Sequence, residues 1–432
     1  MKLQGTMSVK GNELYIGGVG CTELRKKYKT PLYVFDEELV RSNCKEYIKH
    51  FKVNENKNRV AYAGKAFLPI YMCKLIDEEG LYLDVVSGGE LFTAYKSGFP
   101  MEKVLFHGNN KTIDEIEMGV NLGVGRFVVD NYYELELLQK ICREKSKIQS
   151  IYFRITPGIE AHTHDYIKTG QIDSKFGFAL SNGDLQDALE NIKKYENINL
   201  VGLHAHIGSQ IFDVEPYLDE VEIMMNLVKE IKQQHNINIE EVDLGGGVGV
   251  YYTESDEPKT IKEFCSSIIQ KVEDVCKDIN ISTPILIIEP GRSIVANAGS
   301  TIYTVGSIKD IKDVRTYVSV DGGMTDNIRP SLYQAGYECS IANKMGIDKN
   351  NKVTIAGKCC ESGDILITDV DVMDIESGDI LIMSSTGAYG YSMSSNYNKI
   401  IKPAVVSVKD GKSKLICKRE SFEDLLRLEI AD

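Results

Sequence analysis

Ionisable side chains gather at the ends of short apolar runs in the first two thirds of the sequence. The runs are rich in β-branched and aromatic residues, which is typical of buried strands. At or just beyond their carboxyl ends stand Lys65, Asp84, His107, Asp130, Arg154, His206, Glu289 and Arg292. An amine, imidazoles, carboxylates and guanidinium groups together can support nucleophilic and acid–base chemistry. A purely structural sheet needs no such set.

Lys65 is the candidate nucleophile. It lies in the segment VAYAGKAF, between small and apolar residues. Such surroundings favour the neutral amine over the charged ammonium, and a neutral amine can attack a carbonyl carbon to form a Schiff base. The alternative is a lysine that ends a strand and reaches water. We favour the nucleophile because of the polar residues that accompany it.

Two glycine-containing segments predict a phosphate site. VDLGGGVGV contains Gly245, Gly246 and Gly247, whose N–H groups can approach an anion without a Cβ in the way. It does not fit a dinucleotide fingerprint, because Val250 stands where a third glycine is required, and it lacks the lysine of a P-loop. EPGRS adds Arg292 beyond the last strand. The loops after strands seven and eight of a βα barrel commonly hold phosphate, so we expect a phosphorylated cofactor.

Glu289 opens the EPGRS segment. A strand-end glutamate commonly forms a salt bridge. In a pyridoxal phosphate site, however, a carboxylate keeps the pyridine nitrogen protonated, and the protonated ring withdraws electrons from a carbanion. Both interpretations stay open at this point.

His204 and His206 alternate in GLHAHIGSQ, and with His162 and His164 they could suggest a metal site. A tetrahedral site would also need a carboxylate and an enclosed position. One histidine stacked on a pyridine ring is a simpler interpretation, with Ser209 as a phosphate donor. We therefore expect no metal.

Three segments near the carboxyl end also carry reactive groups. GKCCESGDIL contains Cys360 and Glu361, which offer a thiol beside a carboxylate but no metal quartet. Cys360 could donate a proton, although buried structural cysteines are more frequent. GGMTDNIRPSLY contains Arg329 and Tyr333, and STGAYGYSMSSNYN contains Tyr389. Each of these segments by itself could be surface.

Eight strand candidates alternate with amphipathic segments between residues 60 and 289. They cover residues 60–64, 82–86, 104–107, 127–130, 151–155, 201–206, 241–244 and 285–289. This count and span favour a closed (β/α)₈ barrel, with an open doubly wound sheet as the alternative. After Pro290 the sequence changes to short alternating runs such as TIYTVGSI and DILIMSS, which are typical of a β-sandwich or small β-barrel.

The predicted fold is therefore α/β plus all-β. Residues 36–293 form the barrel and residues 294–432 form the second domain. The early strand-like pieces ELYIGG and PLYVF precede the first barrel strand. We expect the segment 1–35 to complete the second domain rather than the barrel.

The bulk composition excludes several classes of partner. The 63 acidic and 50 basic side chains leave a formal charge of −13 with no basic patch, so neither nucleic acid nor an anionic membrane is expected. No stretch approaches the roughly 20 apolar residues of a membrane span, and the first residues lack the apolar core of a signal peptide. We expect a cytoplasmic protein whose ten cysteines are reduced.

An ordered set of motifs runs along most of the chain. The segments are AYAGKAF, DVVSGGEL, FHGNNK, HTHDYIKTGQIDSKFGF, GLHAHIGSQ, DLGGGVG, EPGRSIVANAG, DGGMTDNIRPSLY, CCESGDIL and GAYGYSMSSNYN. With this set the chain closely resembles the diaminopimelate decarboxylases. That family belongs to the barrel-fold pyridoxal 5'-phosphate enzymes, which also include ornithine and arginine decarboxylases.

The resemblance implies a role for each matching residue. Lys65 would bind the cofactor covalently, and Cys360 would reprotonate the α-carbon after carbon dioxide leaves. His206 would stack on the cofactor ring, and Glu289 would pair with the pyridinium nitrogen. The other cofactor contacts would be Ser209, Gly246, Gly247, Pro290, Gly291, Arg292 and Tyr389. The substrate contacts would be Arg292, Arg329, Tyr333, Glu361 and Tyr389.

The implied activity is decarboxylation of meso-2,6-diaminopimelate to L-lysine, the last step of lysine biosynthesis. Guanidinium groups suit this substrate because its far end carries a second carboxylate. Glu361 and the HTHDYIKTG segment argue against a related decarboxylase that acts on ornithine, lysine, arginine or a carboxylated polyamine. Retention of Lys65 and Cys360 argues against a non-catalytic regulator, and an alanine-racemase-like enzyme would need a tyrosine acid. The resemblance also implies a homodimer with active sites shared across the interface.

Overall fold

The computed structural model describes residues 1–159 and 174–430, so that His162 and His164 lie outside the described residues. The chain divides into two compact units. One comprises residues 43–249 and 258–291, and we call it the barrel unit. The other comprises residues 1–42, 250–257 and 292–432, and we call it the β unit.

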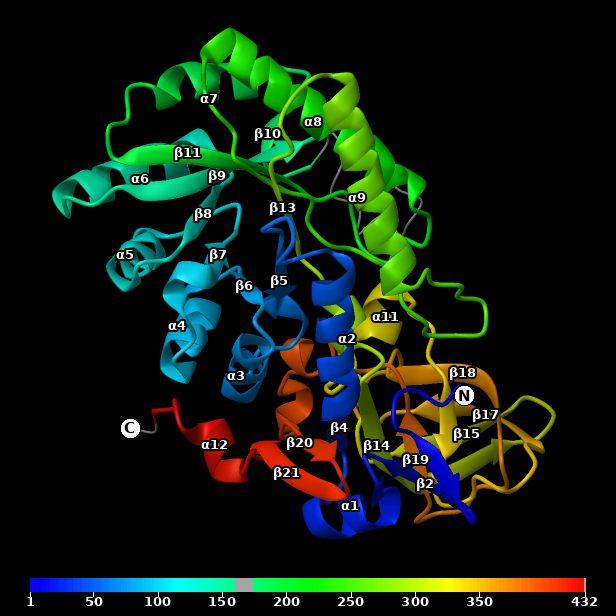
Figure 1. Cartoon of the computed structure of the whole chain (residues 1–432). Coiled ribbons are helices and arrows are strands. Elements are labelled where there is room, and N and C mark those ends of the chain that lie inside the picture. Colours follow the sequence, from blue (N-terminus) through cyan, green and yellow to red (C-terminus); the bar gives the residue numbers. More distant parts are fainter. Residues whose placement is uncertain (160–173, 431–432) are drawn as a thin grey trace. The chain divides into compact units, whose positions relative to one another are not determined.

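The barrel unit is built around eight parallel strands (Figure 1). They are β5 (Arg59–Ala63), β6 (Tyr82–Val85), β7 (Val104–Phe106), β8 (Arg126–Val129), β9 (Gln149–Thr156), β11 (Ile198–Ala205), β12 (Glu241–Asp243) and β13 (Ile285–Ile288). Each pairs with the next, and β13 pairs with β5 to close the ring. The short β10 (Phe178–Ala179) adds to β9. The predicted (β/α)₈ barrel is confirmed, and the open sheet is wrong.

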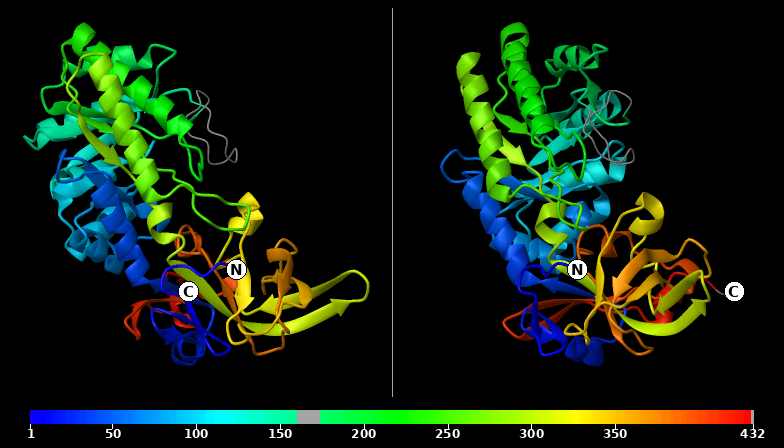
Figure 2. Two further views of the ribbon diagram at one scale, coloured as in Figure 1. Left: turned by 45° about the vertical axis from the view of Figure 1, so that its right-hand side comes forward. Right: turned by 90° about the vertical axis from the view of Figure 1, so that its right-hand side faces the viewer.

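Helices follow the barrel strands along the chain. They are α3 (Ile70–Glu78), α4 (Gly88–Ser97), α5 (Ile113–Leu122), α6 (Tyr132–Glu144), α7 (Asp184–Ile192), α8 (Glu215–His235) and α9 (Ile261–Asp278), with α2 (Glu37–His50) before β5. Capping boxes start two of them, at Thr112 with Glu115 and at Thr260 with Glu263. These side chains satisfy N–H groups that the first helical turn leaves unpaired. Figure 2 shows α8 and α9 packed side by side.

The amino-terminal ends of the barrel strands carry an ionic cluster around a buried glutamate. Glu241, the first residue of β12, accepts two hydrogen bonds from Arg126 at 2.9 Å each. Arg59 Nη1 lies 2.7 Å from the same carboxylate, and Tyr152 donates its hydroxyl to it. Although burial opposes ionisation, the hydrogen bonds from Arg126 and Tyr152 lower the pKa of Glu241. This glutamate is therefore a fully paired anion.

The β unit combines the carboxyl-terminal part of the chain with its first residues. Its strands are β1 (Ser8–Lys10), β2 (Glu13–Ile16), β3 (Val19–Gly20), β4 (Leu32–Asp36), β14 (Gly299–Ile311), β15 (Arg315–Val320), β16 (Cys339–Ile341), β17 (Asn351–Ala356), β18 (Ile365–Val372), β19 (Ile380–Met383), β20 (Ala404–Lys409) and β21 (Lys412–Cys417). Its helices are α1 (Cys21–Tyr28), α10 (Arg292–Val295), α11 (Arg329–Tyr333) and α12 (Phe422–Leu426). The sheet is mostly antiparallel.

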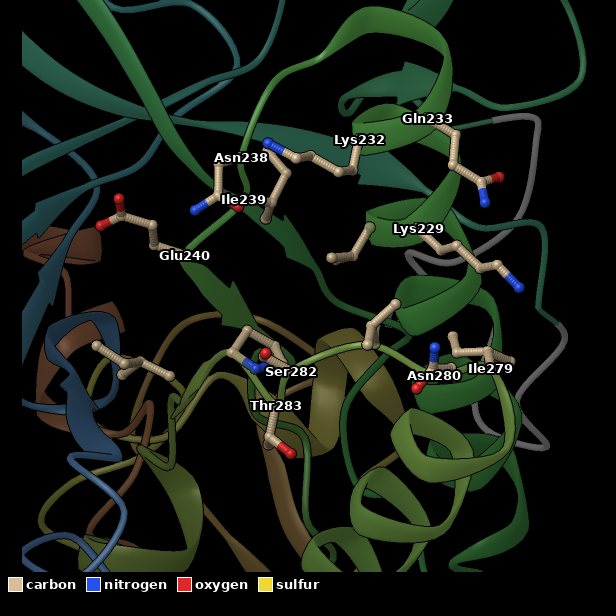
Figure 3. A pocket seen from close by; sticks show the side chains of 14 residues that line it. Lys229, Lys232, Gln233, Asn238, Ile239, Glu240, Ile279, Asn280, Ser282 and Thr283 are labelled. Atoms are coloured by element: carbon tan, nitrogen blue, oxygen red, sulfur yellow. The ribbon is translucent and has the colours of Figure 1, made fainter.

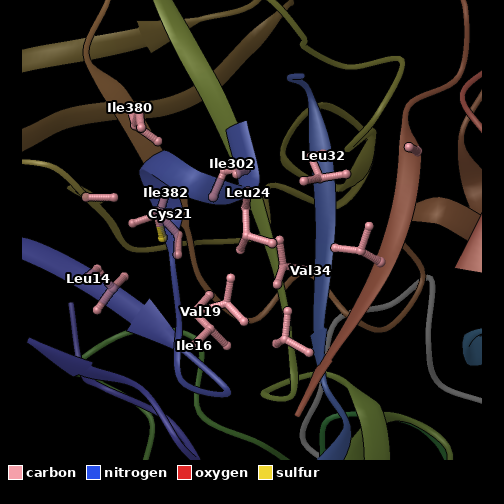
Figure 4. Close-up of a cluster of buried hydrophobic side chains, with 14 residues drawn as sticks. Leu14, Ile16, Val19, Cys21, Leu24, Leu32, Val34, Ile302, Ile380 and Ile382 are labelled. Carbon is pink, nitrogen blue, oxygen red and sulfur yellow. The ribbon is translucent and has the colours of Figure 1, made fainter. Parts of the chain in front are cut away.

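Strand β4 explains why the first residues belong to this unit. It lies between β14, its antiparallel partner, and β20, its parallel partner. Leu32 and Val34 of β4 pack in one buried cluster with Leu24 of α1 and Ile302 of β14 (Figure 4). An apolar strand in the middle of a sheet buries both its faces, so the expected completion of the β domain by the N-terminal segment is confirmed.

Among the described residues, no helix is both long enough and apolar enough to cross a membrane.

Candidate active site

Lys65 lies at the carboxyl end of β5, on the short 3₁₀ helix η1 (Gly64–Ala66). Register places Ala63 of β5 beside Asp84 of β6. Asp84 is buried, and one of its oxygens lies 4.0 Å from Lys65 Nζ. Burial raises the pKa of Asp84, and the charge of nearby Glu289 acts in the same direction. The lysine side chain itself is partly exposed.

Three neighbouring strands place a row of ionisable residues at the same end of the barrel. The register aligns Arg154 of β9 with His204 of β11, and His204 with Asp243 of β12. All three are buried. Side chains on adjacent parallel strands at one level point to the same face, so the row results directly from the strand pairing.

Glu289, directly after β13, is the centre of the cluster at this end. His107 Nε2 lies 2.6 Å from Glu289 Oε1, and His204 Nε2 lies 3.4 Å from Glu289 Oε2. The two imidazole rings meet edge to face at 4.7 Å. Each oxygen of the carboxylate thus has its own imidazole neighbour, and His107 also lies 3.8 Å from Asp84 Oδ1.

The pKa values of the acids in this cluster are shifted in opposite directions. Burial opposes the charge of Glu289, but His107 and His204 outweigh it and hold the Glu289 pKa well below its usual range. Burial, followed by the charge of Glu289, raises the pKa of Asp243 well above its usual value. Burial also lowers the pKa of His204 to about 3. At neutral pH, Glu289 is therefore ionised, while Asp243 and His204 are neutral.

A cavity of about 350 Å³ opens beside this cluster. Its lining residues are Lys65, Val86, His107, Gly108, Asn109, Arg154, Lys175, Phe176, His204, His206 and Glu289. Pockets of this size hold small ligands. The Gly246 N–H donates to His206 Nδ1 at 3.3 Å and so fixes the orientation of the ring. Burial, and then the charges of Lys65 and Arg154, hold the pKa of His206 well below its usual value.

Backbone contacts join the loops after β11, β12 and β13. Ile211 N donates to Gly247 O at 3.0 Å, and Glu289 N donates to Gly245 O at 2.6 Å. Gly247 has φ of +103°, and a Cβ there would lie 2.1 Å from Gly208 O. Only glycine fits such a position. Ser209, Gly246 and Pro290 lie in these joined loops, and Gly291 packs against Ala63 at the end of β5.

The β unit carries a second cluster, of arginines and tyrosines. Arg292 Nη1 donates to the Tyr252 hydroxyl at 2.7 Å, and its guanidinium lies 4.8 Å from the Tyr389 ring. Arg329 Nε donates to the Tyr337 hydroxyl at 2.8 Å. Both arginines are buried. Tyr333 lies against Arg329 at 5.6 Å.

Arg329 has no carboxylate partner within salt-bridge distance among the described residues. Its pKa is raised although burial opposes this, because Tyr337 and Tyr252 surround it. A buried guanidinium without a carboxylate carries a large desolvation penalty that an anionic ligand offsets. The cluster can therefore bind a carboxylate in a geometry with two donors from one arginine.

Cys360 and Glu361 lie on the turn between β17 and β18, where both are exposed. Asp364 shapes this turn, because its buried carboxylate accepts from Met324 N at 2.6 Å and from Cys359 N at 2.8 Å. The hydroxyl of Ser331 in α11 donates to Gly363 O. The turn is thus attached to the helix that carries Arg329. Burial raises the pKa of Cys359, the residue before Cys360, to about 11.

Comparison with known proteins identifies the family. Residues 37–296 match the model of the pyridoxal-binding domain of pyridoxal-dependent decarboxylases. The chain is 49% identical to diaminopimelate decarboxylase of Bacillus subtilis over 96% of this chain and 95% of the relative. It is 48% identical to the enzyme of the same name from Halalkalibacterium halodurans, over 100% of this chain and 98% of that one. The chain belongs to the diaminopimelate decarboxylase family.

Solved structures of the family have the same fold. The structure of diaminopimelate decarboxylase from M. jannaschii in complex with L-lysine matches with a TM-score of 0.94 and 37% identity, covering 100% of this chain and 99% of that one. The resemblance predicted from the motifs is thereby confirmed for the whole length of the chain.

The barrel cavity fits the cofactor of this decarboxylase family. Its lining includes an amine and a buried, ionised carboxylate with two imidazoles beside it. That donor set suits an aldehyde on a pyridine ring, because the amine can bind the aldehyde and the carboxylate can pair with a protonated ring nitrogen. The predicted dependence on pyridoxal phosphate is confirmed.

A larger pocket, of about 680 Å³, lies at the other end of the strands (Figure 3). It is lined by residues around the ends of α8 and α9, with Glu240 before β12 and Ile285 at the start of β13. Its ionisable residues are Lys229, Lys232 and Glu240, and none of them is buried. Volume alone therefore does not locate the chemistry of a barrel decarboxylase, whereas buried ionisable groups do.

Sequence reasoning assigned no role to three members of the barrel cluster. His107 and Asp84 were recognised only as strand-end residues, and Asp243 was missed although it directly precedes the glycine run. His107, His204, Asp243 and Glu289 could in principle hold a metal ion. The 2.6 Å approach of His107 to Glu289 is shorter than the separation of about 3.3 Å between two ligands of a tetrahedral zinc ion. This distance favours direct contact between His107 and Glu289 over a metal ion bound between them.

Proposed function

We propose that the chain decarboxylates meso-2,6-diaminopimelate to L-lysine and carbon dioxide with pyridoxal phosphate in the barrel cavity. The observation that carries the proposal is that the ionised Glu289 and Lys65 line the same cavity. The bound cofactor supplies an electron sink for the electrons left on the α-carbon when carbon dioxide leaves. The family relationship agrees with this assignment.

The barrel residues bind and tune the cofactor. Lys65 would hold it through its amine, and the ionised Glu289 would favour protonation of the ring nitrogen. His206, whose orientation is fixed by Gly246, would stack on the ring. Ser209, Gly246, Gly247, Pro290 and Gly291 contribute donors and space for the phosphate from the joined loops, with Arg292 and Tyr389 completing that set.

The arginine cluster supports a substrate with two carboxylates. One carboxylate of the substrate is lost in the reaction, and the distal one remains. Arg329 offers a buried guanidinium that lacks a carboxylate partner within the described residues, and Tyr333 and Tyr389 lie against it. Arg292 contacts the same Tyr389 ring. Ornithine and lysine have no distal carboxylate to pair with it, which favours diaminopimelate over those substrates.

Cys360 is the proposed proton donor to the α-carbon, and Glu361 the proposed contact to the distal ammonium group. Both are exposed in the single chain. A proton donor acts best where water is excluded. We therefore propose a homodimer in which this turn completes the active site of the other subunit. The cytoplasmic location stays a prediction.

The test is release of carbon dioxide and lysine from purified protein with pyridoxal phosphate and meso-diaminopimelate. Ornithine, lysine and arginine serve as parallel substrates, and Lys65→Ala as the inactive control. We expect lysine from diaminopimelate alone, and borohydride reduction should fix the cofactor on Lys65. Turnover of ornithine or lysine at a similar rate would contradict the substrate, and cofactor binding without any turnover would favour a regulator.

The same assay tests the arginine cluster and the dimer. Arg329→Lys keeps a positive charge but not the paired donors, so KM for diaminopimelate should rise by at least about 10-fold. Mixing Lys65→Ala with Cys360→Ala subunits should restore part of the activity, because one site in a mixed dimer has both residues intact. No restoration after subunit exchange would contradict shared sites.

A further inference from the structure

The surroundings of Glu289 suggest a role for residues beyond the known set. Both oxygens of this carboxylate have an imidazole neighbour, at 2.6 Å for His107 and 3.4 Å for His204. All three side chains are at least 95% buried. A buried carboxylate is commonly kept ionised by arginine or lysine. Here the nearest partners are imidazoles.

The choice of imidazole has a chemical consequence. Arginine partners would neutralise the carboxylate permanently and weaken its attraction for a further cation. His204 is a neutral ring, with a pKa lowered to about 3 by burial, so it orients Glu289 without cancelling its charge. Asp243 beside it is held neutral as well. Of the carboxyl groups of Glu289 and Asp243, Glu289 therefore carries the negative charge.

The fold holds the two imidazoles rigidly. His204 lies within β11, in register between Arg154 and Asp243. His107 follows β7, and its backbone N–H donates to the backbone oxygen of Val85 at 2.8 Å. The rings also pack edge to face, which restricts both of them.

We infer that His107 and His204 are positioning residues that hold both oxygens of Glu289, so that this carboxylate is aimed and charged before the cofactor binds. The inference rests on the proposed function, in which Glu289 pairs with the cofactor ring. Neither histidine touches the reacting atoms in this scheme. Each acts through Glu289 alone.

A double-mutant cycle tests this dependence. His107→Asn and His204→Asn shorten the side chain so that it no longer reaches the carboxylate, and each is made in the natural background and in Glu289→Gln. The dissociation constant of pyridoxal phosphate is measured by titrating apoprotein. We expect each substitution to raise it about 10-fold beside Glu289, and less than about 2-fold beside the glutamine.

Further readouts separate positioning from a purely structural role. The visible absorbance of the bound cofactor, followed against pH, should shift toward that of Glu289→Gln in both histidine variants. His107→Gln and His204→Gln place an amide N–H near the original Nε2, so they should recover most of the affinity. His235→Asn is the matched control, because this histidine contacts Gln186 at the end of α8. This substitution should change neither the dissociation constant of the cofactor nor its absorbance.

The outcomes distinguish this inference from the proposed function. Equal losses in both backgrounds would overturn the inference, as would an unchanged spectrum. If an asparagine variant does not fold, the corresponding phenylalanine variant, which keeps a ring but has no nitrogen, replaces it in both backgrounds of the cycle. Failure of the natural protein to act on diaminopimelate would refute the substrate and leave the cycle intact, because the cycle measures cofactor affinity.

Discussion

Two buried glutamates lie at opposite ends of the same barrel and have opposite kinds of partner. Glu241, at the amino-terminal end of β12, is paired with Arg59 and Arg126. Glu289, just beyond the carboxyl end of β13, has His107 and His204. Both carboxylates are ionised. One is neutralised by permanent cations, and the other is not.

The difference in partners indicates that Glu241 stabilises the fold, whereas Glu289 is available to bind a ligand. Guanidinium partners remain charged at every physiological pH, so the Glu241 cluster is electrically complete. The Glu289 cluster has an ionised acid beside the neutral His204 and Asp243, no arginine within salt-bridge distance of Glu289 among the described residues, and an adjacent cavity. Its charge is left for a cationic group, which in the proposed function is the protonated cofactor ring. The arrangement of partners, more than burial, distinguishes the two ends.

Removing the charge of Glu241 should cause the largest loss of stability. Glu241→Gln leaves the partly buried Arg59 and Arg126 without an anion, and the about 3–5 kcal/mol that breaking a fully buried pair costs is the upper bound of the loss. The denaturation midpoint in urea measures the loss. Activity per folded molecule should change little, and a fall in kcat at full folding would contradict a purely stabilising role.

Glu289→Gln should give the converse result. We expect kcat to fall on the order of 10²-fold, which corresponds to about 2.7 kcal/mol, because the ring nitrogen loses its charged partner. The denaturation midpoint of the apoprotein should stay close to that of the unchanged chain. A loss of stability as large as that of Glu241→Gln would remove the distinction between the two ends.

Acidification should affect the imidazole end selectively. His204 has a pKa of about 3 in the folded chain against 6.5 for an ordinary histidine, so between these values the unfolded chain binds more protons. Stability then falls as pH falls. We expect the apoprotein to lose about 1 kcal/mol between about pH 7 and pH 5.5 through this residue.

His204→Gln is the variant for this measurement. It should lose less stability over the same pH interval, as judged from urea denaturation at each pH. His206, whose pKa is also lowered by burial, contributes with the same sign and is present in both proteins. Identical pH dependence of the two proteins would show that His204 is not titrating as described.

Asp243→Asn should have the smallest effect, and of opposite sign. Because the folded-state pKa of Asp243 is raised, its contribution to stability is favourable below the unfolded pKa and is lost as pH rises. An asparagine keeps the oxygen that accepts from Gly245 N at 2.9 Å. We expect a gain of roughly 0.5–1 kcal/mol at neutral pH that shrinks toward pH 4. A loss at neutral pH would contradict a neutral Asp243.

Much of the barrel could be predicted from local pattern. The eight apolar runs coincide with the eight strands, and most of the polar residues at their ends lie at one face. Alternation in ELYIGG and PLYVF likewise indicated β2 and β4. The roles of Lys65, His206 and Glu289 in the site remain predictions, although the three residues line one cavity.

The neighbours of each side chain could not be predicted in this way. Asp243 ends an apolar strand, and only the register of β12 with β11 brings it beside His204. Tyr252 and Tyr337 were missed because tyrosines in loops carry no local signal, yet they contact Arg292 and Arg329. The Arg292–Tyr252 contact joins residues 40 apart along the chain, and the Arg329–Tyr337 contact depends on the fold of the loop after α11.

The sequence by itself determined the strand count, the glycine positions and the chemical groups at the strand ends, because these depend on residue type and short-range periodicity. It placed Glu289 at the carboxyl end of its strand, but it did not predict the partners of either Glu289 or Glu241. The tertiary structure decided which of them meets arginine and which meets histidine. Arg126 and Glu241 are 115 residues apart, and only barrel closure brings such residues within hydrogen-bond distance.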